Sequence, residues 1–112
     1  MKRQTLHNAL SKVAEVRQLS NRENKIHKNT LILAKKPQVG STTSSIAGFQ
    51  LWEVMCYVPS TSIVALDLLT EQVIKVLKDL QIELTGNITP EFYDDSLKAY
   101  MVSIEFRIPK IL

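Results

Sequence analysis

Cysteine, glycine and proline are scarce in this sequence, with one, three and four residues among 112. A single cysteine excludes a disulfide within the chain and a cysteine-rich zinc site. The three glycines, Gly40, Gly48 and Gly86, lie too far apart to form a phosphate-binding loop. The motifs of serine hydrolases, zinc proteases and redox-active dithiols are absent as well. We therefore expect no enzymatic activity, with no catalytic, metal-binding or cofactor-binding residue.

Long apolar runs are missing too. None approaches the ~18 residues of a membrane span, and the basic first residues lack the apolar segment of a secretory signal. We therefore expect an intracellular protein without a membrane partner. The composition, 45% hydrophobic and 22% charged, is typical of a folded protein. The length predicts one domain over residues 1–112 with a modest core.

Charge is divided unevenly along the chain. Residues 1–36 hold nine Lys/Arg against two Glu, whereas residues 37–112 hold five Lys/Arg against nine Asp/Glu. Oppositely charged regions of identical subunits could attract one another head to tail. The basic third could instead bind nucleic acid, or simply be a solvated helix and linker. All seven aromatic residues lie in the acidic part, which argues against a base-stacking surface and direct nucleic-acid binding.

The first third of the chain predicts one helix and one strand. Leu6, Leu10, Val13 and Ala14 recur at helical spacing and predict a helix over about residues 4–18. This helix and a polar, basic linker account for residues 1–29. The apolar T-L-I-L-A that follows predicts the first strand. Five consecutive hydroxyl residues between glycines and a proline then predict a flexible loop over residues 36–48.

The middle of the chain predicts a strand that turns directly into a helix. Apolar residues alternate over residues 49–58, and Pro59 ends the strand because it cannot donate to a sheet. The hydroxyls of residues 60–62 are suitable N-caps, and the helix continues to about Leu80. Cys56 lies on the same face of this strand as Trp52, toward the helix, so we interpret it as a core residue.

Two further strands complete the pattern, one starting near Gln81 and one ending at Pro109, with a turn at D-D-S before the second. The sequence therefore predicts an α+β fold in the order α-β-β-α-β-β. We expect a four-stranded, mostly antiparallel sheet, in strand order 1-2-4-3. The long helix covers one face, and a short helix precedes the sheet.

The second face of the predicted sheet is mixed rather than polar. A face that meets only water is usually polar, so we expect it to be partly covered. Either the N-terminal helix lies across it or a neighbouring subunit does. The candidate subunit-interface residues are Leu51, Glu53, Met55, Tyr57, Met101, Glu105 and Arg107. The hydroxyl-rich loop is a candidate docking segment that orders on binding, with residues Gly40, Ser41, Thr42, Thr43, Ser44 and Ser45.

Two stretches carry a resemblance to a known family. A tryptophan-containing strand, L-W-E-V-M-C-Y-V-P, breaks at proline into one long helix, and an alternating strand, S-L-K-A-Y-M-V-S-I-E-F-R-I-P, ends the chain. This order of elements resembles the tail terminator and tail completion proteins of long-tailed bacteriophages, the family of the lambda minor tail protein U, and the related tail-to-head joining proteins. The resemblance extends from about Thr30 onward and concerns element order rather than an invariant motif.

The resemblance implies a structural protein of a phage or prophage. Its subunits would form a homo-oligomeric ring, expected to be a hexamer, that caps the tail tube protein and docks to the head connector protein. It would act in the host cytoplasm during assembly and then in the virion. The family has no catalytic residues to carry over. Two alternatives remain open: a head-side joining or adaptor protein of the same fold, and a small nucleic-acid-binding or regulatory domain that uses the basic first third.

Overall fold

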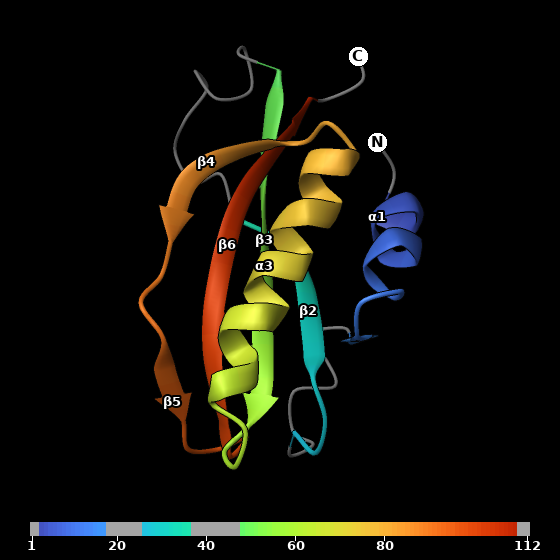
Figure 1. Cartoon of the computed structure of the whole chain (residues 1–112). Helices are drawn as coiled ribbons and strands as arrows, with labels where there is room; N and C mark the ends of the chain where they lie inside the picture. Colours follow the sequence, from blue (N-terminus) through green and yellow to red (C-terminus); the bar gives the residue numbers. More distant parts are fainter. Residues whose placement is uncertain (1–2, 18–25, 37–47, 110–112) are drawn as a thin grey trace.

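The computed structural model describes residues 3–17, 26–36 and 48–109. These residues form a single sheet with two helices (Figure 1). Their order along the chain is α1 (Arg3–Leu10), β1 (Glu15–Arg17), β2 (Thr30–Lys35), β3 (Phe49–Pro59), α3 (Val64–Asp79), β4 (Glu83–Ile88), β5 (Phe92–Asp94) and β6 (Ala99–Pro109).

The sheet has six strands and is mixed. Its hydrogen-bonded order is β1-β2-β3-β6-β4, and β5 pairs with β6 as well. β1 runs parallel to β2, and all other pairs are antiparallel. The central pair, β3 with β6, keeps one register over its whole length, from Phe49 opposite Pro109 to Pro59 opposite Ala99.

The prediction of a four-stranded sheet in the order α-β-β-α-β-β is therefore wrong. The four expected strands are present as β2, β3, β4 and β6, and they are neighbours in the order β2-β3-β6-β4. β1 and β5 were not expected. Each is only three residues long, too short for side-chain alternation to reveal a strand.

β1 lies in a segment that was expected to be helical. α1 ends at Leu10, and a turn follows in which the Ser11 hydroxyl donates to the Asn8 carbonyl and the Val13 N–H donates to the Leu10 carbonyl. Val13 and Ala14 still pack against the core, but they do so from this turn. Their spacing correctly indicated burial, whereas it did not indicate how far the helix extends.

β4 and β5 form one interrupted edge along β6. The register shifts between Leu84 and Ile88, and Gly86 adopts a φ of +90°, a backbone conformation that glycine tolerates best. Pro90 has no N–H to donate to the sheet. Beside it the Thr89 N–H donates to the Ser103 carbonyl, and the Ser103 N–H donates to the Thr89 hydroxyl.

The strand-to-helix corner differs from the prediction in its capping. The N-cap of α3 is Ile63, which already has helical backbone angles and makes no side-chain cap. Backbone turns lead into the helix instead, because the Ser62 N–H donates to the Pro59 carbonyl and the Ala65 N–H to the Ser62 carbonyl. The hydroxyls of residues 60–62 therefore do not cap the helix.

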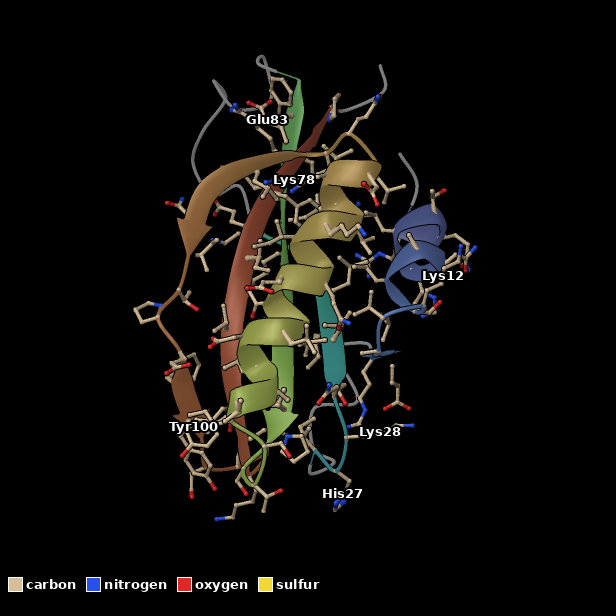
Figure 2. The ribbon with its side chains drawn as sticks, viewed as in Figure 1. Lys12, His27, Lys28, Lys78, Glu83 and Tyr100 are labelled. Atoms are coloured by element: carbon tan, nitrogen blue, oxygen red, sulfur yellow. The ribbon has the colours of Figure 1, made fainter. Side chains whose placement is uncertain are left out.

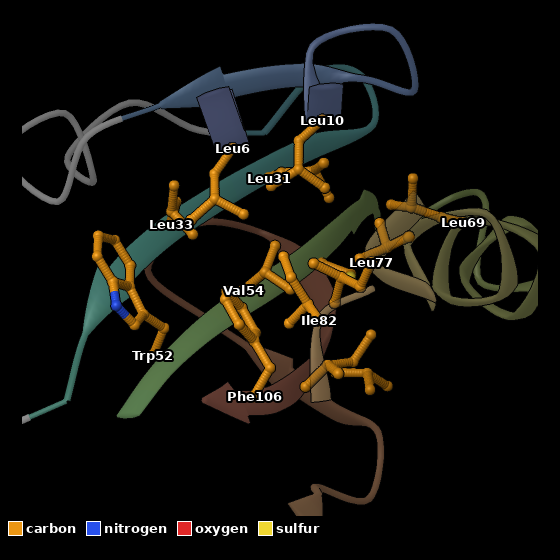
Figure 3. Close-up of a cluster of buried hydrophobic side chains, with 14 of the residues drawn as sticks. Leu6, Leu10, Leu31, Leu33, Trp52, Val54, Leu69, Leu77, Ile82 and Phe106 are labelled. Atoms are coloured by element: carbon orange, nitrogen blue, oxygen red, sulfur yellow. The ribbon is translucent and has the colours of Figure 1, made fainter. Parts of the chain in front are cut away.

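Both helices contribute to the same hydrophobic core on one face of the sheet (Figure 3). The Trp52 and Phe106 rings stack with centroids 6.5 Å apart. Cys56 is buried in this core, as predicted. The core side chains from the two helices are Leu6 and Leu10 of α1 and Leu66, Leu69, Val73 and Leu77 of α3.

The leucines of α3 provide a direct test of this core. Leu77 is fully buried, whereas Leu68 of the same helix is 58% exposed. We expect Leu77→Ala to lower the free energy of unfolding by about 2–5 kcal/mol, because it leaves a cavity. The same substitution at Leu68 should change it by less than about 0.5 kcal/mol. Urea denaturation of both variants measures the difference, and equal losses would contradict the assigned face of α3.

Candidate functional site

The second face of the sheet is covered at one end by the chain's own loops. The expectation that the N-terminal helix lies across this face is wrong, because α1 packs into the core on the α3 side. Ile26 and Leu97 lie here instead, joined by a hydrogen bond of 3.0 Å from the Ile26 N–H to the Leu97 carbonyl. They form a second apolar cluster with Ile32, Ala34, Met55, Tyr57, Ala99 and Met101.

This packing changes the prediction of a subunit interface. Met55 and Met101 are 7% exposed, Tyr57 is fully buried and Glu105 is 8% exposed. These four side chains offer a neighbour almost no surface. The prediction of a contact on this face now rests on the half-buried Leu51, Glu53 and Arg107. The predicted docking segment, residues 40–45, lies outside the described residues.

A polar cluster occupies the middle of the second face. Glu53 and Glu105 are directly opposite one another on β3 and β6. Glu105 accepts hydrogen bonds from Lys36 Nζ at 2.6 Å, from Thr85 Oγ1 at 2.6 Å and from Asn87 Nδ2 at 2.8 Å. Glu53 accepts one from the Ser103 hydroxyl at 3.0 Å. A cavity of about 170 Å³ lies among these residues.

The hydrogen bonds decide the charge state of this cluster. Burial favours the neutral form of Glu105, but the bonds from Lys36, Thr85 and Asn87 outweigh it and lower the pKa of Glu105 to about 2. The hydrogen bond to Glu105 raises the pKa of Lys36. Both groups are therefore charged at neutral pH. Glu105 is too weak a base to accept protons in catalysis, so its arrangement suits a structural anchor.

The anchor lies where the chain leaves β2 and enters β3, at the two ends of the segment formed by residues 37–47. Lys36 follows β2 directly, and its N–H donates to the Leu51 carbonyl at 2.9 Å. The Gln50 side-chain amide donates to the Lys36 carbonyl at 3.1 Å. Glu105 binds the Lys36 side chain from β6. The entrance and the exit of the hydroxyl-rich segment are thus fixed to the centre of the sheet.

A second cavity lies at the far end of the β3–β6 pair, with a volume of about 320 Å³. Its wall is mainly apolar, and Glu83 of β4 and Arg107 of β6 form an ion pair there. The Arg107 guanidinium also lies over the Phe49 ring, 5.2 Å from its centroid, within the ~6 Å of a cation–π contact. This pairing accounts for the charge of Arg107 without a ligand.

A third feature, which we call the acidic groove, was not predicted from the sequence. It lies between α3 and the interrupted β4–β5 edge and has a volume of about 490 Å³. Its carboxylates come from both sides, and Val102 of β6 forms part of its lining. The other lining residues have hydroxyl or apolar side chains. The full lining is Asp67, Thr70 and Glu71 from α3, Ile88, Thr89 and Glu91 from the edge, and Val102. The acidic composition after residue 36 was visible in the sequence, but its concentration beside α3 was not.

The remaining chemically active residues do not assemble with these features. Burial raises the pKa of the Cys56 thiol to about 12, which leaves almost no thiolate at neutral pH. His27 is exposed, and His7 is half-buried on α1. Within residues 3–17, 26–36 and 48–109, no three His, Cys, Asp or Glu side chains are grouped closely enough to hold a metal ion.

Comparisons of the chain with models of protein families, with curated proteins and with solved structures found no match. Among the described segments, no helix has the length and apolar character needed to cross a membrane.

The lowered pKa of Glu105 predicts how the free energy of unfolding changes in acid. Its pKa in the folded protein lies below the ordinary 4.5, so ionised Glu105 stabilises the fold above that pH. This contribution should disappear as the pH falls from about 4.5 to about 2. Glu105→Gln should lower the free energy of unfolding at neutral pH by about 1.5–3 kcal/mol and should weaken the pH dependence in this window.

Urea denaturation across this pH range measures the effect. Glu91→Gln is the matched control, because Glu91 is exposed and should contribute little. Identical acid profiles for the native protein and Glu105→Gln would rule out the anchor.

Cys56 gives a separate test of the core. We expect its thiol to resist a disulfide-exchange reagent in the folded protein at about pH 8, and to react at once in denaturant. The absorbance of the released thiolate follows the reaction. Fast labelling of the folded protein would show that Cys56 is accessible.

Proposed function

We propose that this protein is a structural subunit of a phage or prophage tail, of the tail terminator or tail completion type. Its subunits form a ring, expected to be a hexamer, that caps the tail tube and presents a surface to the head connector. Such a protein works through its surfaces, first in the host cytoplasm and then in the virion.

One observation carries this proposal: opposite charges lie at opposite edges of the sheet. Residues 3–36 contribute α1 and the β1–β2 edge, and their described part holds six basic residues against one acidic residue. Residues 48–109 hold nine acidic residues against four basic ones, and Glu83, Glu91 and Asp94 lie in or between β4 and β5 at the opposite edge. A subunit with two different, complementary edges suits a repeated head-to-tail contact, which closes into a ring when the rotation allows.

The order of elements adds support. A tryptophan-containing strand that breaks at Pro59 into the long α3, followed by a final alternating strand, is the pattern in which the chain resembles tail terminator proteins. The head-side adaptor of the same fold shares this pattern, and only its position in the virion would distinguish it.

The nucleic-acid alternative is less well supported by the surface. Single-stranded nucleic acid is usually bound where basic residues accompany exposed aromatic rings. Near the basic edge, the aromatic ring is that of Trp52, which is 3% exposed and lies beneath Arg3 and Lys35. The most exposed described aromatic residues, Phe92 and Tyr93, lie on β5 at the opposite edge.

Electron microscopy with negative stain tests the proposal. We expect the purified protein to form rings and, when mixed with purified tail tubes, to occupy one end of each tube and stop its elongation. Tube protein without the subunit is the control and should continue to polymerise. A protein that never binds tube ends, at any concentration, would contradict this function.

A further inference from the structure

We propose that the acidic groove binds the basic edge of a second copy of this chain. The basic edge consists of α1, the turn after it, β1 and the residues just before β2, with Lys12 and Lys28 among its exposed cations. This inference rests on the proposed function in one respect only, since it names the contact through which the ring would form.

The acidic groove is built to receive a cation. Asp67 and Glu71 stand one turn apart on α3, and Glu91 faces them from the β4–β5 edge. All three side chains are exposed, and none forms an ion pair with any residue that the structure describes. Carboxylates from two elements around one groove create a negative potential that attracts a positively charged partner.

The groove also offers apolar surface. Ile88 in its wall is 46% exposed, and Leu68, three residues before Glu71 on α3, is 58% exposed. Residues three apart on a helix are surface neighbours, so Leu68 lies close to the acidic wall. Exposed apolar residues next to unpaired charges are typical of a protein–protein contact, rather than of a site for free ions.

The basic edge lies on the other side of α3. Figure 2 places Lys12 beside α1, in the turn that follows it, and Lys28 below it, whereas Tyr100 lies beside β5 across the molecule. Lys12 is exposed, and the Lys28 side chain is 68% exposed with its ammonium 3.8 Å from Glu15. A pair at this separation and exposure is weak, so Lys28 remains available to a stronger partner.

The strand order makes this contact intermolecular. β1 and β4 are at the two ends of the path β1-β2-β3-β6-β4, and α3 lies over the strands between them (Figure 1). A chain therefore cannot place its own basic edge in its own groove. A neighbouring copy beside the β4–β5 edge can place its basic edge there, because its α1 side then approaches the groove side of α3. The contact joins two different surfaces and leaves one of each unused, as ring growth requires.

Charge-reversed variants of the full chain test the contact. The groove variant is Asp67→Lys with Glu71→Lys, and the edge variant is Lys12→Glu with Lys28→Glu. Each alone meets like charge at the contact, so its self-association constant should fall by at least about tenfold. An equimolar mixture should associate again, because each variant supplies the complement of the other. Sedimentation velocity at low salt measures all three, and added salt should weaken the native contact.

Two matched controls separate the contact from general effects of charge. Asp79→Lys reverses a single carboxylate at the far end of α3, and Lys12→Arg keeps the charge of the basic edge. Both should associate like the native protein. Circular dichroism checks that every variant is folded, and recovery in the mixture shows directly that the two variants are competent.

The outcomes distinguish this inference from the proposed function. If each variant alone loses self-association and the mixture recovers it, the result supports the contact, even if the rings never bind tail tubes. A native protein that stays monomeric at low salt overturns the inference. So does association that the variants leave unchanged, even if tube ends are capped. A monomer whose groove binds a lysine-rich peptide would also overturn it, because the occupant would then be a different basic partner.

Discussion

The antiparallel pairing of β3 with β6 is the constraint on which the rest of this structure depends. Side chains alternate along both strands, so one register assigns every residue of the pair to a face. Trp52 lies opposite Phe106 on the core face, and Glu53 lies opposite Glu105 on the second face. A slip of β6 by one residue would place Glu105 under α3 and turn the Phe106 ring to the second face. The hydrophobic core and the Glu105 anchor therefore fix the same register from opposite faces.

The same central pair separates the charges of the molecule. Because β3 and β6 occupy the middle of the sheet, β2 and β1 can add only on one side and β4 and β5 only on the other. The described residues of the basic first third are thereby placed toward one edge, and the acidic wall of α3 faces the other. A charge imbalance along the sequence becomes a charge difference across the molecule, which is the property that a repeated head-to-tail assembly needs.

Local patterns were sufficient for some of these features and insufficient for others. The alternation over β6, the helical spacing in α3 and the burial of Cys56 were predicted correctly, because each follows from hydrophobic periodicity within one element. The turn at Asp94 was also predicted, and its carboxylate accepts from the Ser96 hydroxyl and the Leu97 N–H. β1 and β5 were missed because their strand character comes from pairing with β2 and β6.

Whether a feature could be predicted depends on how far apart in the chain its interacting residues lie. Neighbouring residues in the sequence specify periodicity, turns and the total charge of a segment, so the long helix, the four longer strands and the charge imbalance could be read directly. The cover of the second face by Ile26 and Leu97, the hydrogen bonds that join Lys36 to Glu105, and the meeting of Glu71 with Glu91 around one groove unite residues that are distant in the chain. They depend on how strands pair and helices pack, and no local pattern encodes that pairing.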